Sequence, residues 1–267
     1  MDYLVKMGGS VITDIRKQNT AKPAEILRIF KEIKPGLKDK RMVVGHGSGS
    51  FAHIPAHKYK VNSGLCGDRS MKGASITQDA AANLHRIVFN GAIAAGIRPL
   101  SFPPSSGALS ENGTIKSWDL SAMMHALDRG FVPITYGDVV IDSAKGISIA
   151  STEEVFRHIA KATRPRKIVI GTDVDGIFDS DPKTNEDARL IKEVNRSNIA
   201  EILDYAGGST KVDVTGGMKT KIRYLYDMSK DTGAICQIIN LMVPGNLKKT
   251  IEGRKVVGTT IDANRGK

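Results

Sequence analysis

The chain has 267 residues, which is enough to bury a large core as one large or two closely joined domains. Its formal net charge is +11, but the basic residues are scattered, aromatic residues make up only 5%, and no run of five like charges occurs. This distribution argues against a nucleic-acid-binding surface and favours a site for anionic metabolites. We therefore expect a small-molecule partner and no nucleic acid.

Cysteine usage and hydropathy indicate a reduced compartment. Cys66 and Cys236 are far apart and lack a C-x-x-C partner, so the sequence suggests neither a disulfide framework nor a zinc site. No stretch approaches the roughly 18 apolar residues of a transmembrane helix, and the N-terminus begins with a strand pattern rather than a signal peptide. We expect a soluble, cytoplasmic protein without a membrane partner.

The first part of the chain alternates short apolar runs with amphipathic segments. Pro23 is placed to open a helix that Pro35-Gly36 ends, and Gly96 closes a second, longer helix. The elements predicted in chain order are a strand at 3–7, a helix from 23, a strand at 42–44, a helix at 72–95, an extended run at 99–102, a loop at 103–107, a strand at 114–118, a helix at 120–129, and strands at 131–136 and 147–150. This order predicts an α/β fold with a mainly parallel sheet covered on both faces.

From Lys167 the pattern of strands and helices restarts. We predict a buried strand at 168–170, helices at 199–205 and 217–229, and a strand at 234–239. The basic, proline-containing segment 161–166 is the predicted junction between an acceptor lobe, 1–165, and a nucleotide lobe, 166–267. Because this junction is short, we expect one continuous structural unit.

Two glycine-rich turns follow the first two predicted strands. The first, loop 1, reads Lys-x-Gly-Gly-Ser over 6–10, and the second, loop 2, reads Gly-His-Gly-Ser-Gly-Ser-Phe-Ala-His over 45–53. Without a Cβ in the way, backbone N–H groups can converge on an anion, so such loops often bind phosphate. A lysine on loop 1 and a histidine at the end of loop 2 predict a phosphoryl donor facing a phosphorylated acceptor, as in a small-molecule kinase.

Other interpretations of these glycines explain less. Gly47-x-Gly49-x-x-Ala52 also fits a dinucleotide-binding fingerprint, with Asp68 about 20 residues further on, but this leaves loop 1 unexplained. No G-x-x-x-x-G-K-[ST] motif occurs, which disfavours a P-loop kinase. A third interpretation is that the glycines only form tight turns, but their occurrence in three clusters argues against it.

The third glycine cluster reads Thr-Gly-Gly-Met-Lys-Thr-Lys over 215–221, at the start of a predicted helix. The amide groups and the positive dipole end of a helix attract anions, and Lys219 and Lys221 add charge, which suits a nucleotide polyphosphate.

A polar segment follows the predicted strand at 168–170. It reads Gly-Thr-Asp-Val-Asp-Gly over 171–176, at the edge where α/β sheets bind ligands. Asp173 or Asp175 could place a ribose or a magnesium ion, although Asp-Gly is also a common turn former.

These motifs, together with Tyr136-Gly137-Asp138, resemble in order the motif series of the amino acid kinase superfamily, and most closely its isopentenyl phosphate kinases. The Ser-Phe-x-His element at 50–53 separates this group, because acetylglutamate, aspartate and uridylate kinases lack that histidine. The resemblance implies an open αβα sandwich and a homodimer. It also implies a step of isoprenoid precursor synthesis by an alternative mevalonate route, in which ATP, with Mg²⁺, phosphorylates isopentenyl phosphate to isopentenyl diphosphate.

The resemblance and the chemistry of phosphoryl transfer assign the site. Transfer between two phosphates gathers negative charge, so positioning and charge neutralisation dominate the chemistry. Catalysis is assigned to Lys6, His53 and Glu153. The ATP-binding residues expected are Lys6, Gly8, Gly9, Ser10, Thr172, Asp173, Asp175, Gly216, Gly217, Lys219 and Lys221. The acceptor-binding residues expected are Gly47, Ser48, Gly49, His53, Gly137 and Asp138, and no dedicated metal ligand is assigned.

The chain departs from the superfamily pattern in three places. Ser-Thr-Glu-Glu over 151–154 replaces the usual Ser-Gly-Asp, so Glu153 either orients the catalytic lysine or is a plain acid in the first turn of a helix. Ala52 stands where glycine is usual before His53, and a further family lysine after loop 1 has only Arg16 and Lys17 as candidates. His53 itself also fits an ordinary loop histidine. The five other histidines are interpreted as structural: His46, His57, His85, His125 and His158.

Because the chain departs from the superfamily pattern, two other functions remain as alternatives. One is a phosphonate kinase of the fosfomycin-resistance type. The other is a non-catalytic protein that binds nucleotides or polyphosphate on the same fold.

Overall fold

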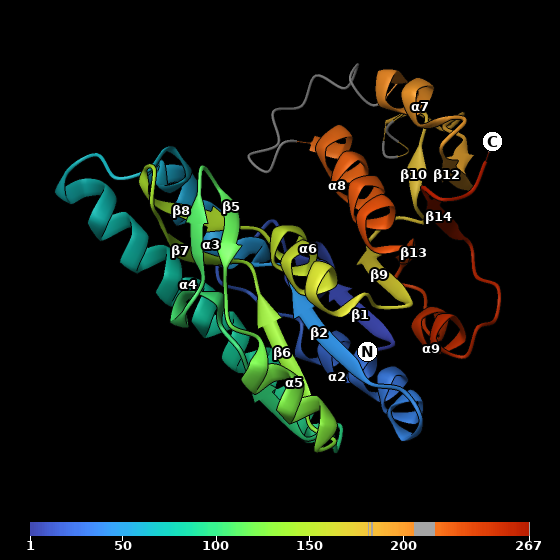
Figure 1. Ribbon diagram of the computed structural model, residues 1–267, viewed down its shortest axis with the longest axis horizontal. Coiled ribbons are helices and arrows are strands. Elements are labelled where there is room, and N and C mark those ends of the chain that lie inside the picture. Colours follow the sequence, from blue (N-terminus) through green and yellow to red (C-terminus); the bar gives the residue numbers. More distant parts are fainter. Residues whose placement is uncertain (181, 183, 206–216, 267) are drawn as a thin grey trace.

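A largely parallel eight-stranded sheet forms the centre of the computed structural model, which describes residues 1–180, 182, 184–205 and 217–266 (Figure 1). The strand order is β12-β14-β13-β9-β1-β2-β6-β3, and within the described part of this sheet only β13 and β14 pair in the antiparallel direction. The strands are β1 (Tyr3–Met7), β2 (Met42–His46), β3 (Pro99–Ser101), β6 (Val132–Tyr136), β9 (Lys167–Thr172), β12 (Glu193–Asn195), β13 (Ile235–Asn240) and β14 (Gly258–Asp262). The predicted α/β class with a mainly parallel sheet is confirmed.

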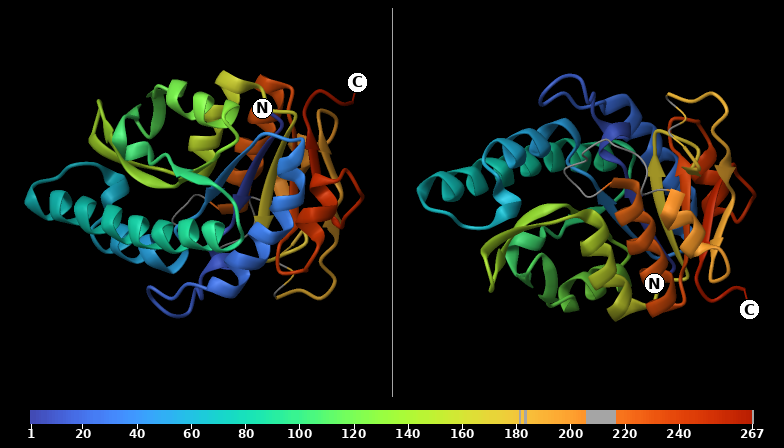
Figure 2. Two further views of the ribbon diagram at one scale, coloured as in Figure 1. Left: turned by 90° about the horizontal axis from the view of Figure 1, so that it is seen from below. Right: turned by 90° about the horizontal axis from the view of Figure 1, so that it is seen from above.

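Helices cover both faces of this sheet (Figure 2). Alternate strand residues enter two separate cores, as the period of two in a strand requires: Leu4 packs on one face and Val5 on the other. The Leu4 face is covered by α5 (Ser121–Asp128), α6 (Thr152–Thr163) and α8 (Gly217–Thr232); the Val5 face is covered by α2 (Pro23–Ile33), α4 (Asp68–Ala94) and α9 (Asn246–Ile251). The result is an αβα sandwich in which both faces of the central strands are buried.

Local sequence signals account for several helix boundaries. Pro23 occupies the first turn of α2, where its missing N–H costs nothing, and the Ser151 hydroxyl caps α6 by accepting a hydrogen bond from the Glu154 amide, 3.2 Å away. The remaining helices are α1 (Gly9–Ile12), α3 (Gly49–Lys58) and α7 (Ile199–Tyr205), with 3₁₀ turns η1 (Lys34–Lys38), η2 (Val61–Ser63) and η3 (Pro104–Ser106). Helix α3 was not predicted, because it contains Pro55 and opens on a glycine.

A second, four-stranded sheet of order β5-β4-β7-β8 corrects the prediction for the middle of the chain. The expected strands at 114–118 and 147–150 belong to this sheet rather than to the central parallel series. Its strands are β4 (Leu109–Glu111), β5 (Thr114–Ser117), β7 (Asp138–Asp142) and β8 (Gly146–Ala150). Asn112 and Gly113 both have positive φ, as a two-residue hairpin turn between β4 and β5 requires.

Asp142 holds the turns of this second sheet together. Its carboxylate accepts hydrogen bonds from the backbone N–H groups of Gly113 and Lys145 and from the Ser110 hydroxyl. Burial acts to raise the pKa of Asp142, but these donors outweigh it and hold the pKa well below its ordinary value. The turn residues signalled hairpins here, whereas the short apolar runs alone suggested more parallel strands.

The central sheet is continuous across the predicted junction at 161–166. Strand β9, which follows the junction, pairs directly with β1, so that Tyr3 lies opposite Lys167 and Met7 opposite Gly171. The strands of the C-terminal half therefore lie on one side of β1, and β2, β6 and β3 lie on the other. Within the described residues, none of the helices combines the length and the apolar character needed to span a bilayer.

Two imidazoles are buried together between β2 and α4. His46 Nε2 lies 3.1 Å from His85 Nδ1, and the two residues are 1% and 7% exposed. Burial lowers the pKa of His46 to about 3, helped by the nearby charges of His85 and Lys6. Burial likewise lowers the pKa of His85 to about 4, with a smaller contribution from Arg86. Both rings are therefore neutral at pH 7.

We expect the free energy of unfolding to fall as the pH drops from 6.5 toward 4. Over that interval the two histidines take up protons in the unfolded chain but stay neutral in the folded protein, so acid favours unfolding. For His85 the loss is about 2 kcal/mol at pH 5. Urea unfolding of the wild type and of His85→Asn at pH 7 and pH 5 measures this loss of unfolding free energy. An equal loss in both proteins would contradict the role of this ring.

Candidate functional site

The carboxyl ends of three central strands lie side by side. Met7 at the end of β1 is in register with His46 of β2 and with Gly171 of β9. The amide of Gly8 continues this pairing by donating to the carbonyl oxygen of Gly171 at 2.9 Å. Loop 1, loop 2 and the segment after β9 therefore leave the sheet at one edge, which is where open α/β sheets bind their ligands.

Loop 1 and loop 2 contact each other through their backbones. A Cβ on Gly9 would lie 2.5 Å from the backbone nitrogen of Gly49, closer than any side chain can approach. Gly49 also has a φ of +49°, the left-handed region that favours glycine. Thr13 fixes the contact, because its hydroxyl donates to the Gly9 carbonyl at 2.7 Å and accepts from the Ser50 amide at 3.1 Å. The predicted side-by-side arrangement of the two loops is thus present.

Lys6 forms a buried ion pair with Glu153 at this edge. The Lys6 Nζ lies 2.5 Å from Glu153 Oε1, and the residues are 9% and 8% exposed. Burial acts to raise the pKa of Glu153, but the charge and hydrogen bond of Lys6, together with the charge of Lys221, leave it below its ordinary value. Glu153 is therefore an ionised partner of Lys6, and the alternative of a plain, solvated first-turn acid does not describe it.

The N-terminus of α6 places Glu153 where Lys6 can reach it. The Thr152 hydroxyl donates to the carbonyl oxygen of His46 at 2.8 Å, which fastens the first turn of α6 to the end of β2. A glycine at position 152, as in the superfamily pattern, could not make this bond. Sequence reasoning noted Thr152 only as a departure from the superfamily pattern and did not predict this hydrogen bond.

The third glycine cluster contributes through α8. Gly217 begins this helix, Lys219 is exposed, and Lys221 lies near enough for its charge to act on Glu153. Gly216 lies outside the described residues, as does the rest of the predicted motif before it. The structure thus brings together Lys6, Glu153 and Lys221 from three different elements.

The segment after β9 also meets loop 1. The Ser10 hydroxyl donates to Asp173 Oδ1 at 2.9 Å. Asp175 Oδ1 accepts from the Asn240 side-chain amide at 3.0 Å, and the Thr172 hydroxyl donates to the Val174 carbonyl at 2.7 Å. Of the expected nucleotide-side residues, Asp173 contacts loop 1 directly, whereas Thr172 and Asp175 order the turn that carries it.

On the side expected from the sequence to bind the acceptor, loop 2 lies against the turn at Gly137. The Ser48 hydroxyl donates to the Gly137 carbonyl at 3.3 Å, and the Gly137 amide donates to the His46 carbonyl at 3.3 Å. Asp138 is buried and accepts hydrogen bonds from the backbone, while burial raises its pKa. His53 lies exposed at the start of the second turn of α3.

The basic residues near loop 1 include one that sequence reasoning did not name. Arg16 pairs with Asp14 at 3.3 Å, and its side chain is 86% exposed. Lys22, twelve residues after Ser10, instead brings its ammonium group 3.3 Å from the Ser10 carbonyl oxygen. An isolated bridge between Thr13 and Ala21 closes the intervening chain, and no local pattern in the sequence signals it.

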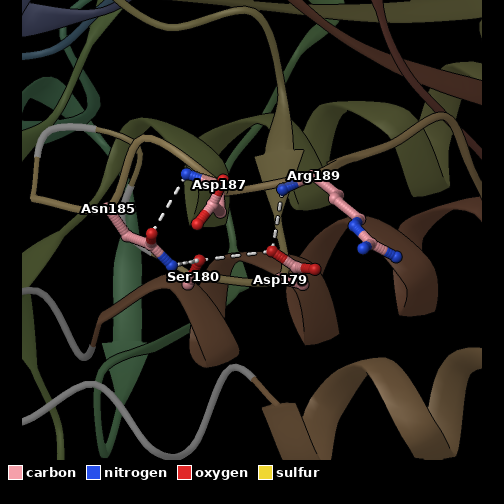
Figure 3. A pocket seen from close by; sticks show the side chains of 5 residues that line it. All are labelled: Asp179, Ser180, Asn185, Asp187 and Arg189. Carbon is pink, nitrogen blue, oxygen red and sulfur yellow. Dashed lines mark hydrogen bonds between the residues drawn. The ribbon is translucent and has the colours of Figure 1, made fainter.

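A hollow of about 490 Å³ lies elsewhere, at the hairpin of β10 (Ile177–Phe178) and β11 (Leu190–Ile191) (Figure 3). Its polar groups satisfy one another: Asp179 accepts from the Arg189 amide at 2.9 Å, and the Asn185 side chain donates to the Ser180 hydroxyl at 3.0 Å. None of the residues given as its lining belongs to loop 1 or loop 2. We therefore assign this hollow no role in the chemistry.

The geometry defines a phosphotransferase-type site. Two glycine loops in backbone contact, a buried lysine held by a carboxylate and a second lysine nearby can bind and neutralise two phosphorylated ligands. Within the described residues, no group of three His, Cys, Asp or Glu side chains is arranged to hold a metal ion.

Comparison with known proteins identifies the class. Residues 3–240 match the amino acid kinase family, and the chain belongs to that family of phosphotransferases. Isopentenyl phosphate kinase from Methanothermobacter thermautotrophicus is 35% identical over 97% of this chain and 98% of its own length. A solved isopentenyl phosphate kinase structure superimposes with a TM-score of 0.83 at 31% identity, covering 98% of this chain and 100% of that chain. A substrate complex of such a kinase gives a TM-score of 0.79 at 30% identity, covering 97% and 99%.

We expect Gly9→Ala to disrupt the contact between the two loops. The new Cβ meets backbone atoms of Gly49, which cannot rotate away as a side chain could, so the loops must separate. Overpacking of this kind costs about 1–3 kcal/mol of stability. Urea unfolding and calorimetric titration with ATP measure the effects, and weaker ATP binding is expected. Gly107→Ala is the control, since its Cβ would lie an ordinary 3.7 Å from Trp118; unchanged ATP affinity in Gly9→Ala would refute the role of the contact.

Proposed function

We propose that this protein transfers the γ-phosphoryl group of ATP to isopentenyl phosphate and releases isopentenyl diphosphate and ADP. The observation that carries the proposal is the backbone contact between loop 1 and loop 2 next to the buried Lys6–Glu153 pair. Similarity to isopentenyl phosphate kinases over nearly the whole chain supports this acceptor. No observation of the fold favours a phosphonate acceptor or a loss of catalysis.

The two halves of the chain have separate tasks in this proposal. Residues 1–165 hold the acceptor and residues 166–267 hold ATP, and the halves meet where β1 pairs with β9. Loop 1 begins at the end of β1, so it stands at the boundary that the phosphoryl group must cross. The ATP phosphates are then bound by Gly8, Gly9 and Ser10. The acceptor phosphate is bound by Gly47, Ser48, Gly49 and His53.

In the transfer, an oxygen of the acceptor phosphate forms a bond to the γ-phosphorus of ATP as the bond to the β-phosphate oxygen breaks. The acceptor is already ionised, so the reaction needs no strong base. Lys6 neutralises charge on the transferring group; two unit charges about 4 Å apart interact by about 4 kcal/mol at an effective dielectric of about 20. Glu153 keeps Lys6 oriented, and Lys221 serves the nucleotide side.

A magnesium ion fits this site as a companion of ATP. Such ions are usually held by one or two carboxylates and the substrate phosphates rather than by a protein cage. In this proposal Asp173, which is hydrogen-bonded to Ser10 of loop 1, would share the ion with the phosphates of ATP. The ion would supply charge neutralisation on the triphosphate.

The proposal extends to the location and the assembly of the enzyme. We propose that it acts in the cytoplasm, since Cys66 and Cys236 are both free thiols, as in a reducing compartment. We further propose a homodimer on the basis of the superfamily resemblance, which sedimentation equilibrium can test.

A substrate panel tests the proposed function. With ATP and magnesium chloride present, we expect ADP release to rise on addition of isopentenyl phosphate, measured with a coupled assay. A response only to phosphonates would overturn the proposal in favour of a phosphonate kinase. Tight nucleotide binding without turnover on any acceptor would identify a nucleotide-binding protein instead.

Lys6→Ala tests the catalytic cation. Losing a main charge stabiliser should lower kcat by about a hundredfold or more, because the transferring phosphoryl group would lose the cation assigned to it, while Lys221 is assigned to the nucleotide side. Lys167→Ala is a matched control: this lysine lies on the neighbouring strand β9 at the opposite end of the sheet, where it donates to Gln237. Near-normal turnover in Lys6→Ala would contradict the assignment, provided that Lys167→Ala is also active.

A further inference from the structure

His46 is the residue that joins the elements of the acceptor side. Its main-chain carbonyl accepts from the Thr152 hydroxyl of α6 and from the Gly137 amide. Its ring Nδ1 lies 3.2 Å from the carbonyl oxygen of Gly47, inside loop 2. The proposed mechanism gives this buried ring no part, although it touches the loop that serves the acceptor phosphate.

The hydrogen bonds of this ring have only one self-consistent direction. The Gly47 carbonyl can only accept, so His46 Nδ1 must carry the proton, and in a neutral imidazole Nε2 is then an acceptor. Its neighbour at 3.1 Å, His85 Nδ1, must therefore donate. His85 Nε2 in turn accepts from the Ser101 hydroxyl at 2.7 Å. A directed chain thus runs from Ser101 of β3, through His85 of α4 and His46 of β2, to loop 2.

Packing holds both rings in place for this chain. The ring of Tyr136 stacks on His46 and on His85, with centroids 5.3 and 4.5 Å apart and interplanar angles of 15° and 28°. Phe89 lies one turn along α4 from His85, and the centroids of these two rings are 6.0 Å apart. The rings therefore have little freedom to adopt another hydrogen-bonding partner.

Fixing the Gly47 carbonyl also fixes an amide of loop 2. The peptide group is planar and trans, so the C=O of Gly47 and the N–H of Ser48 lie in one plane and point in opposite directions. A hydrogen bond that holds the carbonyl toward His46 holds the Ser48 N–H away from it. In this way the buried chain sets the direction of a backbone donor in the loop.

We propose that His85 is a positioning residue for the acceptor phosphate: by donating to His46 it fixes the His46 tautomer, and so the orientation of the Gly47–Ser48 peptide. This inference rests on the proposed function of loop 2. It extends the site to α4, which contributes a residue that never touches the ligand.

Three substitutions of His85 separate this role from simple packing. Asparagine places its amide nitrogen at the position of Nδ1 and can still donate to His46. Glutamine places its amide near Nε2, which keeps a partner for Ser101 but removes the donor to His46. Leucine fills space and has no donor. Val88 is buried in the same helix but takes no part in these hydrogen bonds, so Val88→Ala reports the effect of packing loss alone.

We expect His85→Gln and His85→Leu to raise the KM for isopentenyl phosphate about tenfold, as the loss of a buried donor predicts, while the KM for ATP and kcat change little. His85→Asn should stay close to the wild type, and Val88→Ala should lower the Tm without moving the acceptor KM. Nitrogen NMR of the imidazoles should find His46 protonated at Nδ1 in the wild type and in His85→Asn.

Two results would overturn the inference: equal acceptor KM values in His85→Asn and His85→Gln, or a wild-type His46 that carries its proton on Nε2. The comparison of asparagine with glutamine keeps the test decisive if His85→Leu fails to fold. A wild type without turnover on isopentenyl phosphate would refute the proposed function instead, and the NMR result would still decide the direction of the chain.

Discussion

The register of β1 against its two neighbours is the constraint on which the site depends. Because Met7 lies opposite both His46 and Gly171, three chain segments leave the sheet at one level and must share a small space. Only glycine allows the close backbone approach of loop 1 to loop 2 at Gly9 and Gly49. The position of Lys6, one residue before the end of β1, follows from the same register.

The buried ion pair of Lys6 and Glu153 lies beside these loops, and its burial has an energetic cost. Burying Lys6 and Glu153 costs desolvation of both, and removing either would leave the other uncompensated. A pair of this kind is therefore weak evidence for stability and stronger evidence for function. The longer glutamate is accommodated because Thr152 ties the start of α6 to the end of β2.

Sequence reasoning predicted six of the eight central strands and most covering helices, because apolar periodicity, Pro23 and Gly96 are local signals, but it did not predict β12, β14 or α9. It missed α3, in which Pro55 contradicts helix propensity, and it placed two strands of the second sheet in the wrong series. The meeting of loop 1 with loop 2 was predictable from strand adjacency. The contributions of Lys22, Thr13 and the pair His46–His85 were not, since each depends on contacts between residues that no spacing in the sequence relates.

The central place of β1 in the sheet also governs how the protein is made. Its partner β9 lies about 160 residues further along the chain, so during synthesis one edge of β1 keeps unpaired backbone N–H and C=O groups until Thr172 has emerged from the ribosome. Gly8 cannot bond to Gly171 before then. A nascent or truncated chain without β9 would accordingly expose this unpaired edge as a template for aggregation, and loop 1 would lack its contact with the segment that follows β9.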